Sequence, residues 1–248
     1  MSSDTDETLP TLPSDIFVVL IDFDETLTKE HTGGALQFRR CSSIAQRRSA
    51  NGTLPMKRID LHRDCANSGD VSLTSNAASG DLAWTFRMLA DIVLRQRRCL
   101  AIVTMADAAH GPMRAAQTNL DPLQYDTLAG ARLVRRWLLC AALVLCDNDY
   151  DRAQSALNEL DASGRFVIVA QAHPSSKETH VRAACQHFFD AQQLDVRRLH
   201  ARHMLYIDNT ECLLRNTAKC FPGMRTVHTP AGIDRNVWQH ICATACLQ

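Results

Sequence analysis

The apolar positions of the chain fall into short continuous runs that alternate with longer stretches of helical periodicity. The runs are rich in β-branched and aromatic residues and contain no polar break. Such runs are typical of strands that are buried on both faces of a parallel sheet. Five strands are predicted in this way, over residues 16–21, 99–103, 165–170, 203–207 and 224–228.

Between the runs, apolar residues recur at steps of three and four, which indicates amphipathic helices. The clearest helix follows Asp81, which is placed to cap its first turn, and ends in Arg95-Gln96-Arg97-Arg98, whose positive charge suits a helix C-terminus. Further helices are predicted over residues 128–145, 149–160, 177–189, 213–220 and 237–245. Helix and strand therefore alternate, which predicts an α/β fold with a Rossmann-like parallel sheet flanked by helices.

Two regions lack this periodicity. Residues 1–15 are polar and acidic with two prolines, so we expect a disordered leader. Residues 41–80 are rich in Ser, Asn, Arg and Gly, and they predict either a loop-like polar insertion or a small cap, at about 35–80. The remainder, residues 16–248, is long enough for one substantial core, so a single domain is expected.

Composition narrows the classes of partner. Lys plus Arg equals Asp plus Glu at 27 each, so no global charge draws the chain to nucleic acid or to an anionic membrane. The apolar run 137–146 is too short to cross a bilayer and is expected in the core or, alternatively, on a partner-binding helix. No nucleic-acid or membrane partner is therefore expected, and the oligomeric state stays open.

The ten cysteines form no Cys-x-x-Cys pair, and the first fifteen residues do not resemble a secretory signal. Free thiols in a reducing, cytoplasmic compartment are the simplest interpretation. His240, Cys242 and Cys246 could form half of a zinc site, but without a second cluster an ordinary set of thiols is the commoner arrangement.

Candidate chemistry begins where the first apolar run ends, in the sequence Asp22-Phe23-Asp24-Glu25-Thr26. Carboxylates are costly inside a buried strand, so they belong at its carboxyl end, where open α/β sheets bind ligands. The period of two in an extended chain places Asp22 and Asp24 on the same side. One carboxylate could attack phosphorus while the other protonates the leaving oxygen, with a divalent cation present. The alternative is an Asp-rich turn that only caps the strand.

Three further strand ends carry polar side chains that suit a phosphate. The hydroxyl of Thr104 could donate to a phosphate oxygen. Lys177 stands at a helix start, where positive charge does not stabilise the helix but suits a phosphoryl group. Asp208 would complete a set of oxygen ligands for Mg²⁺.

The order Asp-x-Asp-x-Thr, Thr, Lys, Asp, with each motif close to the end of a predicted strand, resembles the four motifs of the haloacid-dehalogenase-like (HAD) phosphatase superfamily. Asp-x-Asp-Glu-Thr is similar to the carboxy-terminal-domain type of HAD protein phosphatase. The resemblance implies Asp22 as the nucleophile and Asp24 as the general acid and base. It also implies that Thr104 and Lys177 hold the phosphate, and that Asp22, the main-chain carbonyl of Asp24 and Asp208 bind Mg²⁺.

One position departs from the HAD pattern. A second acid usually follows the last motif directly or a few residues on, whereas Asn209 follows Asp208 here and Glu211 comes later. Asn209 or Glu211 would then support the metal indirectly, or the metal site is weakened. Thr26, the last residue of the first motif, is a further candidate for a supporting role.

The resemblance implies an enzyme, a Mg²⁺-dependent phosphatase that hydrolyses phosphomonoesters through an aspartyl-phosphate. Its substrate would be a phosphorylated small molecule or a phosphoprotein. One alternative is a HAD-fold binding or scaffold module without turnover, suggested by Asn209 and the long insertion, although the intact Asp24 favours an enzyme. The other is a phosphotransferase, which needs a substantial closing cap to exclude water.

Overall fold

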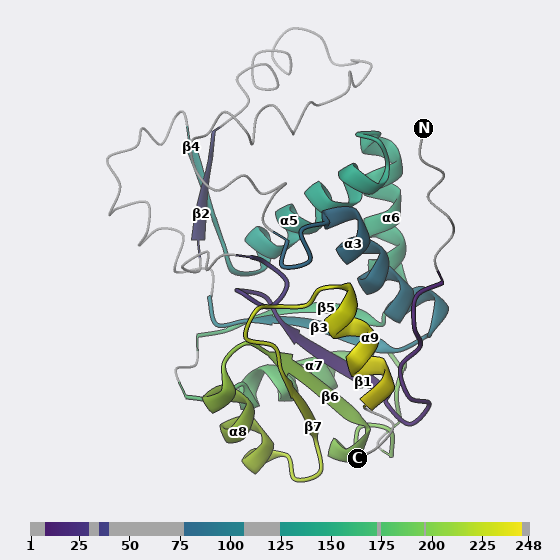
Figure 1. The fold of residues 1–248 in the computed structure, drawn as a ribbon, viewed down its shortest axis with the longest axis vertical. Coiled ribbons are helices and arrows are strands. Elements are labelled where there is room, and N and C mark those ends of the chain that lie inside the picture. Colours follow the sequence, from purple (N-terminus) through teal and green to yellow (C-terminus); the bar gives the residue numbers. More distant parts are fainter. Residues whose placement is uncertain are drawn as a thin grey trace, which may run out of the picture.

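The computed structural model describes residues 8–29, 35–39, 77–106, 125–172, 175–195 and 197–244. The main sheet has five parallel strands: β1 (Val18–Asp22), β3 (Cys99–Thr104), β5 (Phe166–Ala170), β6 (Met204–Asp208) and β7 (Arg225–His228). Their spatial order is β5-β3-β1-β6-β7 (Figure 1). The five predicted strands and the parallel α/β fold are thus confirmed.

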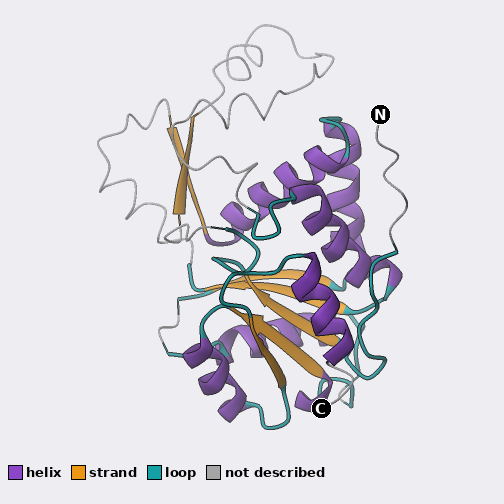
Figure 2. Cartoon of the chain, viewed as in Figure 1, coloured by secondary structure: helices purple, strands orange, loops and turns teal. Residues whose placement is uncertain are grey.

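Helices cover both faces of this sheet (Figure 2). One face carries α3 (Leu82–Ala90) with its π-helical continuation η2 (Asp91–Arg95), α5 (Gly130–Leu145), α6 (Tyr150–Ala162) and α9 (Arg235–Thr244). The other face carries α7 (Glu178–Asp190) and α8 (Glu211–Cys220), and the short 3₁₀ turn η3 (Ala201–His203) precedes β6. Each predicted helix is present, and Asp81 caps α3 by accepting a hydrogen bond from the Trp84 N–H at 2.9 Å.

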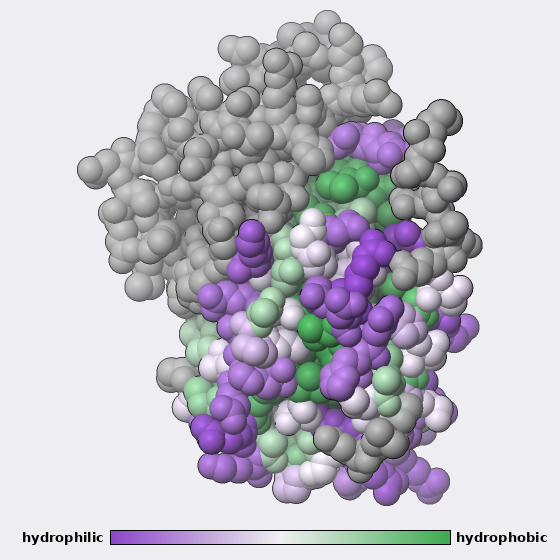
Figure 3. Space-filling model, viewed as in Figure 1, coloured by the Kyte–Doolittle hydropathy of each residue, from purple (hydrophilic) through white to green (hydrophobic). Residues whose placement is uncertain are grey.

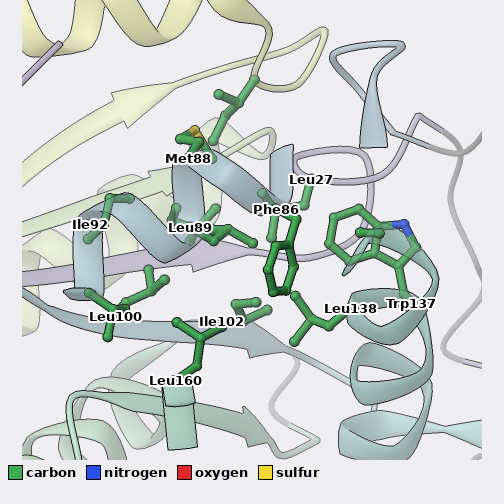
Figure 4. Packing of buried hydrophobic residues seen from close by; sticks show 14 of the residues in the cluster. Leu27, Phe86, Met88, Leu89, Ile92, Leu100, Ile102, Trp137, Leu138 and Leu160 are labelled. Carbon is green, nitrogen blue, oxygen red and sulfur yellow. The ribbon is translucent and has the colours of Figure 1, made fainter. Parts of the chain in front are cut away.

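The alternation of side chains along the strands divides the core into two clusters. In β1, Val19 and Ile21 face the α3, α5 and α6 side, whereas Val18 and Leu20 face α7. Figure 4 shows Leu27, Phe86 and Trp137 gathered in the first cluster. The apolar surface of α5 therefore lies in the core, which is the commoner of the two arrangements expected for it.

The predicted helix over 128–145 begins two residues later, at Gly130. Residues 128 and 129 instead end a strand, β4 (Tyr125–Ala129), which pairs antiparallel with β2 (Ala35–Arg39) in a separate two-stranded sheet. The sequence did not predict this ribbon, because its strands are short, mixed in polarity and far apart along the chain, with no hairpin signal. Of the insertion predicted at 35–80, residues 40–76 lie outside the described residues.

The leader predicted over residues 1–15 is described from residue 8 onward. Leu12 within it is buried in the first cluster, and its N–H donates to the Gln96 side chain at 2.9 Å. This part of the leader therefore packs against the end of η2.

The surface shown in Figure 3 mixes hydrophilic and apolar residues. Within the described ranges, no helix has both the length and the apolar character that crossing a bilayer requires. The cysteines placed there are free thiols, and Cys242 lies buried with its Sγ near the Pro10 carbonyl oxygen. Cys246, the third member of the possible half zinc site, lies outside the described residues.

Candidate active site

The site lies at the carboxyl edge of the main sheet, at the end of its central strand. β1 pairs with β3 on one side and with β6 on the other. The chain builds the sheet outward through β3 and β5 and then returns to the opposite side of β1 with β6 and β7. The order of the strands therefore reverses at β1, which is where open α/β sheets bind their ligands.

Asp22 and Lys177 form a buried ion pair at this edge. The Lys177 Nζ lies 2.8 Å from Asp22 Oδ1, and the two side chains are 1% and 9% exposed. Lys177 is the residue just before α7, where its charge faces the positive end of the helix dipole. Its main-chain N–H donates to the Thr217 hydroxyl of α8 at 2.9 Å. Helix α8 thus holds the start of α7 so that the ammonium reaches the end of β1.

Asp208 ends β6 and is fully buried. The Tyr206 hydroxyl donates to its Oδ2, and the Thr210 N–H donates to its Oδ1 at 2.7 Å. Sequence reasoning missed Tyr206. The signal was present, because a side chain two positions earlier on a strand points to the same side as Asp208.

Thr26 connects Asp22 to the loop after β6. Its hydroxyl lies 3.4 Å from Asp22 Oδ2 and accepts the Asn209 N–H at 3.0 Å. The Asn209 side chain in turn donates to Glu25 Oε2 at 3.1 Å. Thr26 and Asn209 thus connect the turn after β1 to the loop after β6 by hydrogen bonds. Glu211 begins α8 and is exposed, and within the described part of the chain it makes no hydrogen bond to Asp22 or Asp208.

The turn that follows β1 is clamped by a second loop. The Ile233 N–H donates to the Thr26 carbonyl at 2.9 Å. Gly232, beside it, has a φ of +77°, and a Cβ atom there would lie 2.4 Å from the Ala78 Cβ and 3.0 Å from the carbonyl oxygens of Glu25 and Thr26. Only glycine fits this contact, which fixes the path of the backbone around the carboxylates.

Asp24 and Thr104 lie after β1 and at the end of β3, respectively. Asp24 is half-buried in the turn after β1 and close enough to Asp22 to influence its ionisation. Thr104 ends β3 and is buried, and its hydroxyl accepts the Ala106 N–H at 3.3 Å. Among the described residues, no hydrogen bond joins Thr104 to Asp22 or Lys177. The Thr104 carbonyl accepts a hydrogen bond from His180 Nε2 of α7 at 2.9 Å, a contact that sequence reasoning also missed.

Burial dominates the electrostatics of these groups. It raises the pKa of the Asp22 carboxyl to about 7, against the lowering effect of the Lys177 ammonium, and the charge of Asp208 raises it further. The pKa of Asp208 is also raised by burial, and the hydrogen bond from Tyr206 opposes that shift. The pKa of Tyr206 lies well above its ordinary value, first because the phenol is buried and then because Asp208 is near. The phenol is therefore protonated and donates to Asp208.

The oxygen atoms at the site fit Mg²⁺, which does not need a ligand set made of side chains alone. When both are ionised, Asp22 and Asp208 carry more charge than Lys177 offsets, so a divalent cation would compensate the excess. Within the described residues, no group of three or more His, Cys, Asp or Glu side chains could hold a metal. Two carboxylates, the main-chain carbonyl of Asp24 and water would make up the ligands, and Mg²⁺ accepts such a set because it keeps several waters.

No model of a protein family and no curated protein matches the chain. The arrangement that the structure shows is a parallel α/β sheet with flanking helices and a buried cluster of charges at the switch point of its strand order.

Proposed function

We propose that this protein is a Mg²⁺-dependent phosphatase of the HAD type, which hydrolyses phosphomonoesters through an aspartyl-phosphate formed on Asp22. One observation carries the proposal: the buried pair of Asp22 and Lys177 at the end of the central strand, with Asp208 beside it. A buried ion pair contributes little net stability, so its presence in a ligand-binding edge favours a catalytic role.

Asp22 is the nucleophile in this mechanism. Lys177 holds Oδ1 at 2.8 Å, and Oδ2, which has the longer 3.4 Å contact with the Thr26 hydroxyl, is the oxygen that attacks phosphorus. The new bond from Asp22 to phosphorus forms as the bond from phosphorus to the leaving oxygen breaks. Lys177 also neutralises charge on the phosphoryl oxygens as they approach Asp22.

Asp24 transfers the protons. In the first step its carboxylic acid gives a proton to the leaving oxygen. In the second step its carboxylate takes a proton from a water molecule, whose oxygen attacks phosphorus and breaks the bond to Asp22. Phosphate is released, and both carboxyl groups return to their starting states.

Asp22, Asp208 and the main-chain carbonyl of Asp24 would hold Mg²⁺, which supplies positive charge to the phosphate when bound. Thr104 would contribute its hydroxyl to the phosphate, and Thr26 and Asn209 keep Asp22 and the neighbouring loop in place. The order of these groups along the chain supports the HAD assignment. The similarity of Asp-x-Asp-Glu-Thr to the carboxy-terminal-domain type favours a phosphoprotein over a small molecule as substrate.

Release of p-nitrophenol from p-nitrophenyl phosphate, with Mg²⁺ and with a chelator, tests the proposal. Asp22→Asn is expected to lower the Mg²⁺-dependent rate by about a thousandfold or more, because the amide cannot act as the nucleophile. Asp151→Asn on the exposed surface of α6 is the matched control and keeps the wild-type rate. Wild type that is as inactive as Asp22→Asn on this ester and on a panel of phosphorylated metabolites and peptides would favour a binding module. Transfer of the phosphoryl group to an acceptor other than water would favour a phosphotransferase.

A further inference from the structure

Asp208 has a hydrogen bond on each of its carboxylate oxygens. The Thr210 N–H donates to Oδ1, and the Tyr206 hydroxyl donates to Oδ2. Neither donor can turn away easily. Thr210 is the residue that precedes α8, and Tyr206 is fully buried in the cluster between the sheet and α7.

The other carboxylate of the site is restricted in a similar way. Lys177 holds Asp22 Oδ1 at 2.8 Å, and the Thr26 hydroxyl lies 3.4 Å from Oδ2. A cation that binds both oxygens of Asp22 or of Asp208 would have to share each oxygen with an existing donor. A cation that binds one oxygen of each carboxylate meets half as many of these conflicts.

This difference separates two common divalent cations. Ca²⁺ takes six to eight oxygen ligands and often binds both oxygens of a carboxylate, whereas Mg²⁺ takes six ligands in a tight octahedron and keeps several waters. Hydrogen bonds to the outer side of a ligand orient it and tune the metal that it binds.

We propose that Tyr206 determines the cation preference of the site, by holding Asp208 Oδ2 so that Asp208 binds a cation through one oxygen and the site selects Mg²⁺ over Ca²⁺. Tyr206 acts through Asp208 and is a positioning residue. The inference rests on the proposed function only in requiring that a divalent cation binds between Asp22 and Asp208.

The test is direct binding of each cation to the metal-stripped full-length chain, by calorimetric titration with Mg²⁺ and separately with Ca²⁺. Tyr206→Phe removes the hydroxyl and keeps the ring. It is expected to raise the ratio of Ca²⁺ affinity to Mg²⁺ affinity by about tenfold, a change of the order that loss of such a partner has on the affinity for a single metal. Tyr150→Phe, at the start of α6 on the opposite side of the sheet, is the matched control and leaves the ratio unchanged.

If Tyr206 had a role in folding alone, its loss would weaken the binding of both cations alike. An unchanged ratio of affinities in Tyr206→Phe therefore overturns the inference. If Tyr206→Phe does not fold, Asp208→Glu is the second variant. Its longer side chain carries the carboxylate past the Tyr206 hydroxyl, so it is expected to raise the same ratio. The titration does not depend on phosphatase activity. A shifted ratio in a protein that shows no turnover would support the inference and overturn the proposed function. A wild type that binds neither cation overturns the inference itself.

Discussion

The main sheet has an ion pair at its carboxyl edge and another at its amino edge, and the two differ in burial. At the carboxyl edge, Asp22 and Lys177 are almost wholly buried. At the amino edge, Asp15 pairs with Arg225 while 47% of the Asp15 side chain stays exposed. Exposed pairs contribute little to stability, and their position is easily explained by solvation. Burial of charge is expensive, so the carboxyl edge is where a function other than stability is indicated.

At the amino edge, two further arginines lie against an aromatic ring. Arg98 and Arg198 lie over the ring of Phe17, at 5.7 Å and 5.0 Å from its centroid. Arg198 is exposed, whereas Arg98 is half-buried, and burial lowers the pKa of its guanidinium. Removal of a buried charge at the carboxyl edge should therefore have a larger effect on stability than removal of an exposed charge at the amino edge.

The largest effect on stability is expected from Lys177→Met. The variant leaves the Asp22 carboxylate buried without its partner, which should lower the free energy of unfolding by about 3–5 kcal/mol. Urea denaturation followed by circular dichroism measures this. Lys219→Met on the exposed surface of α8 is the matched control and should change stability by less than about 0.5 kcal/mol.

The double variant Lys177→Met with Asp22→Asn separates charge from packing. Because it buries no unpaired charge, it should be more stable than Lys177→Met alone. If Lys177→Met were as stable as wild type, the contrast between the two edges would not hold.

The strand ends were predictable because burying a carboxylate in a strand is so costly that the sequence can place Asp22 and Asp208 only where a strand stops. Lys177 was identifiable for a related reason, since its charge opposes the helix dipole. Tyr206 could have been found from its place two residues before Asp208, but contacts of the site residues with side chains of other elements were not predictable. The Thr217 hydroxyl and His180 depend on how α7 and α8 pack on the sheet, and no local pattern reports that packing. The β2–β4 ribbon was missed for the same reason, because its pairing is remote along the chain.

A smaller effect is expected at the loop that clamps the turn after β1. Gly232→Ala places a Cβ atom against Ala78 and two carbonyl oxygens at a positive φ, and should cost about 2–4 kcal/mol of stability. Gly80→Ala also has a positive φ, of +69°, but its Cβ would meet nothing within 4 Å. It should cost only the backbone term, about 1–2 kcal/mol.

The comparison of the two glycine variants by urea denaturation isolates the steric contact. In addition, Gly232→Ala should lower turnover of p-nitrophenyl phosphate more than its stability loss explains, because the displaced carbonyls belong to the turn that carries Asp24. Equal losses of stability in the two variants would show that the contact with Ala78 is relieved without cost.

The smallest effect is expected from the exposed pair at the amino edge. The hydrogen bond and charge of Arg225 lower the pKa of Asp15 below its ordinary value. A carboxyl whose pKa is lower in the folded chain stabilises that chain above the unfolded pKa of about 3.9, and the contribution is lost as the pH falls through the folded value. Since Asp15 is half-exposed, the contribution should be at most about 1 kcal/mol. Urea midpoints of wild type and Arg225→Gln should therefore differ slightly at pH 6 and converge below pH 3, whereas a difference that persists in acid would assign the effect to packing of the arginine stem.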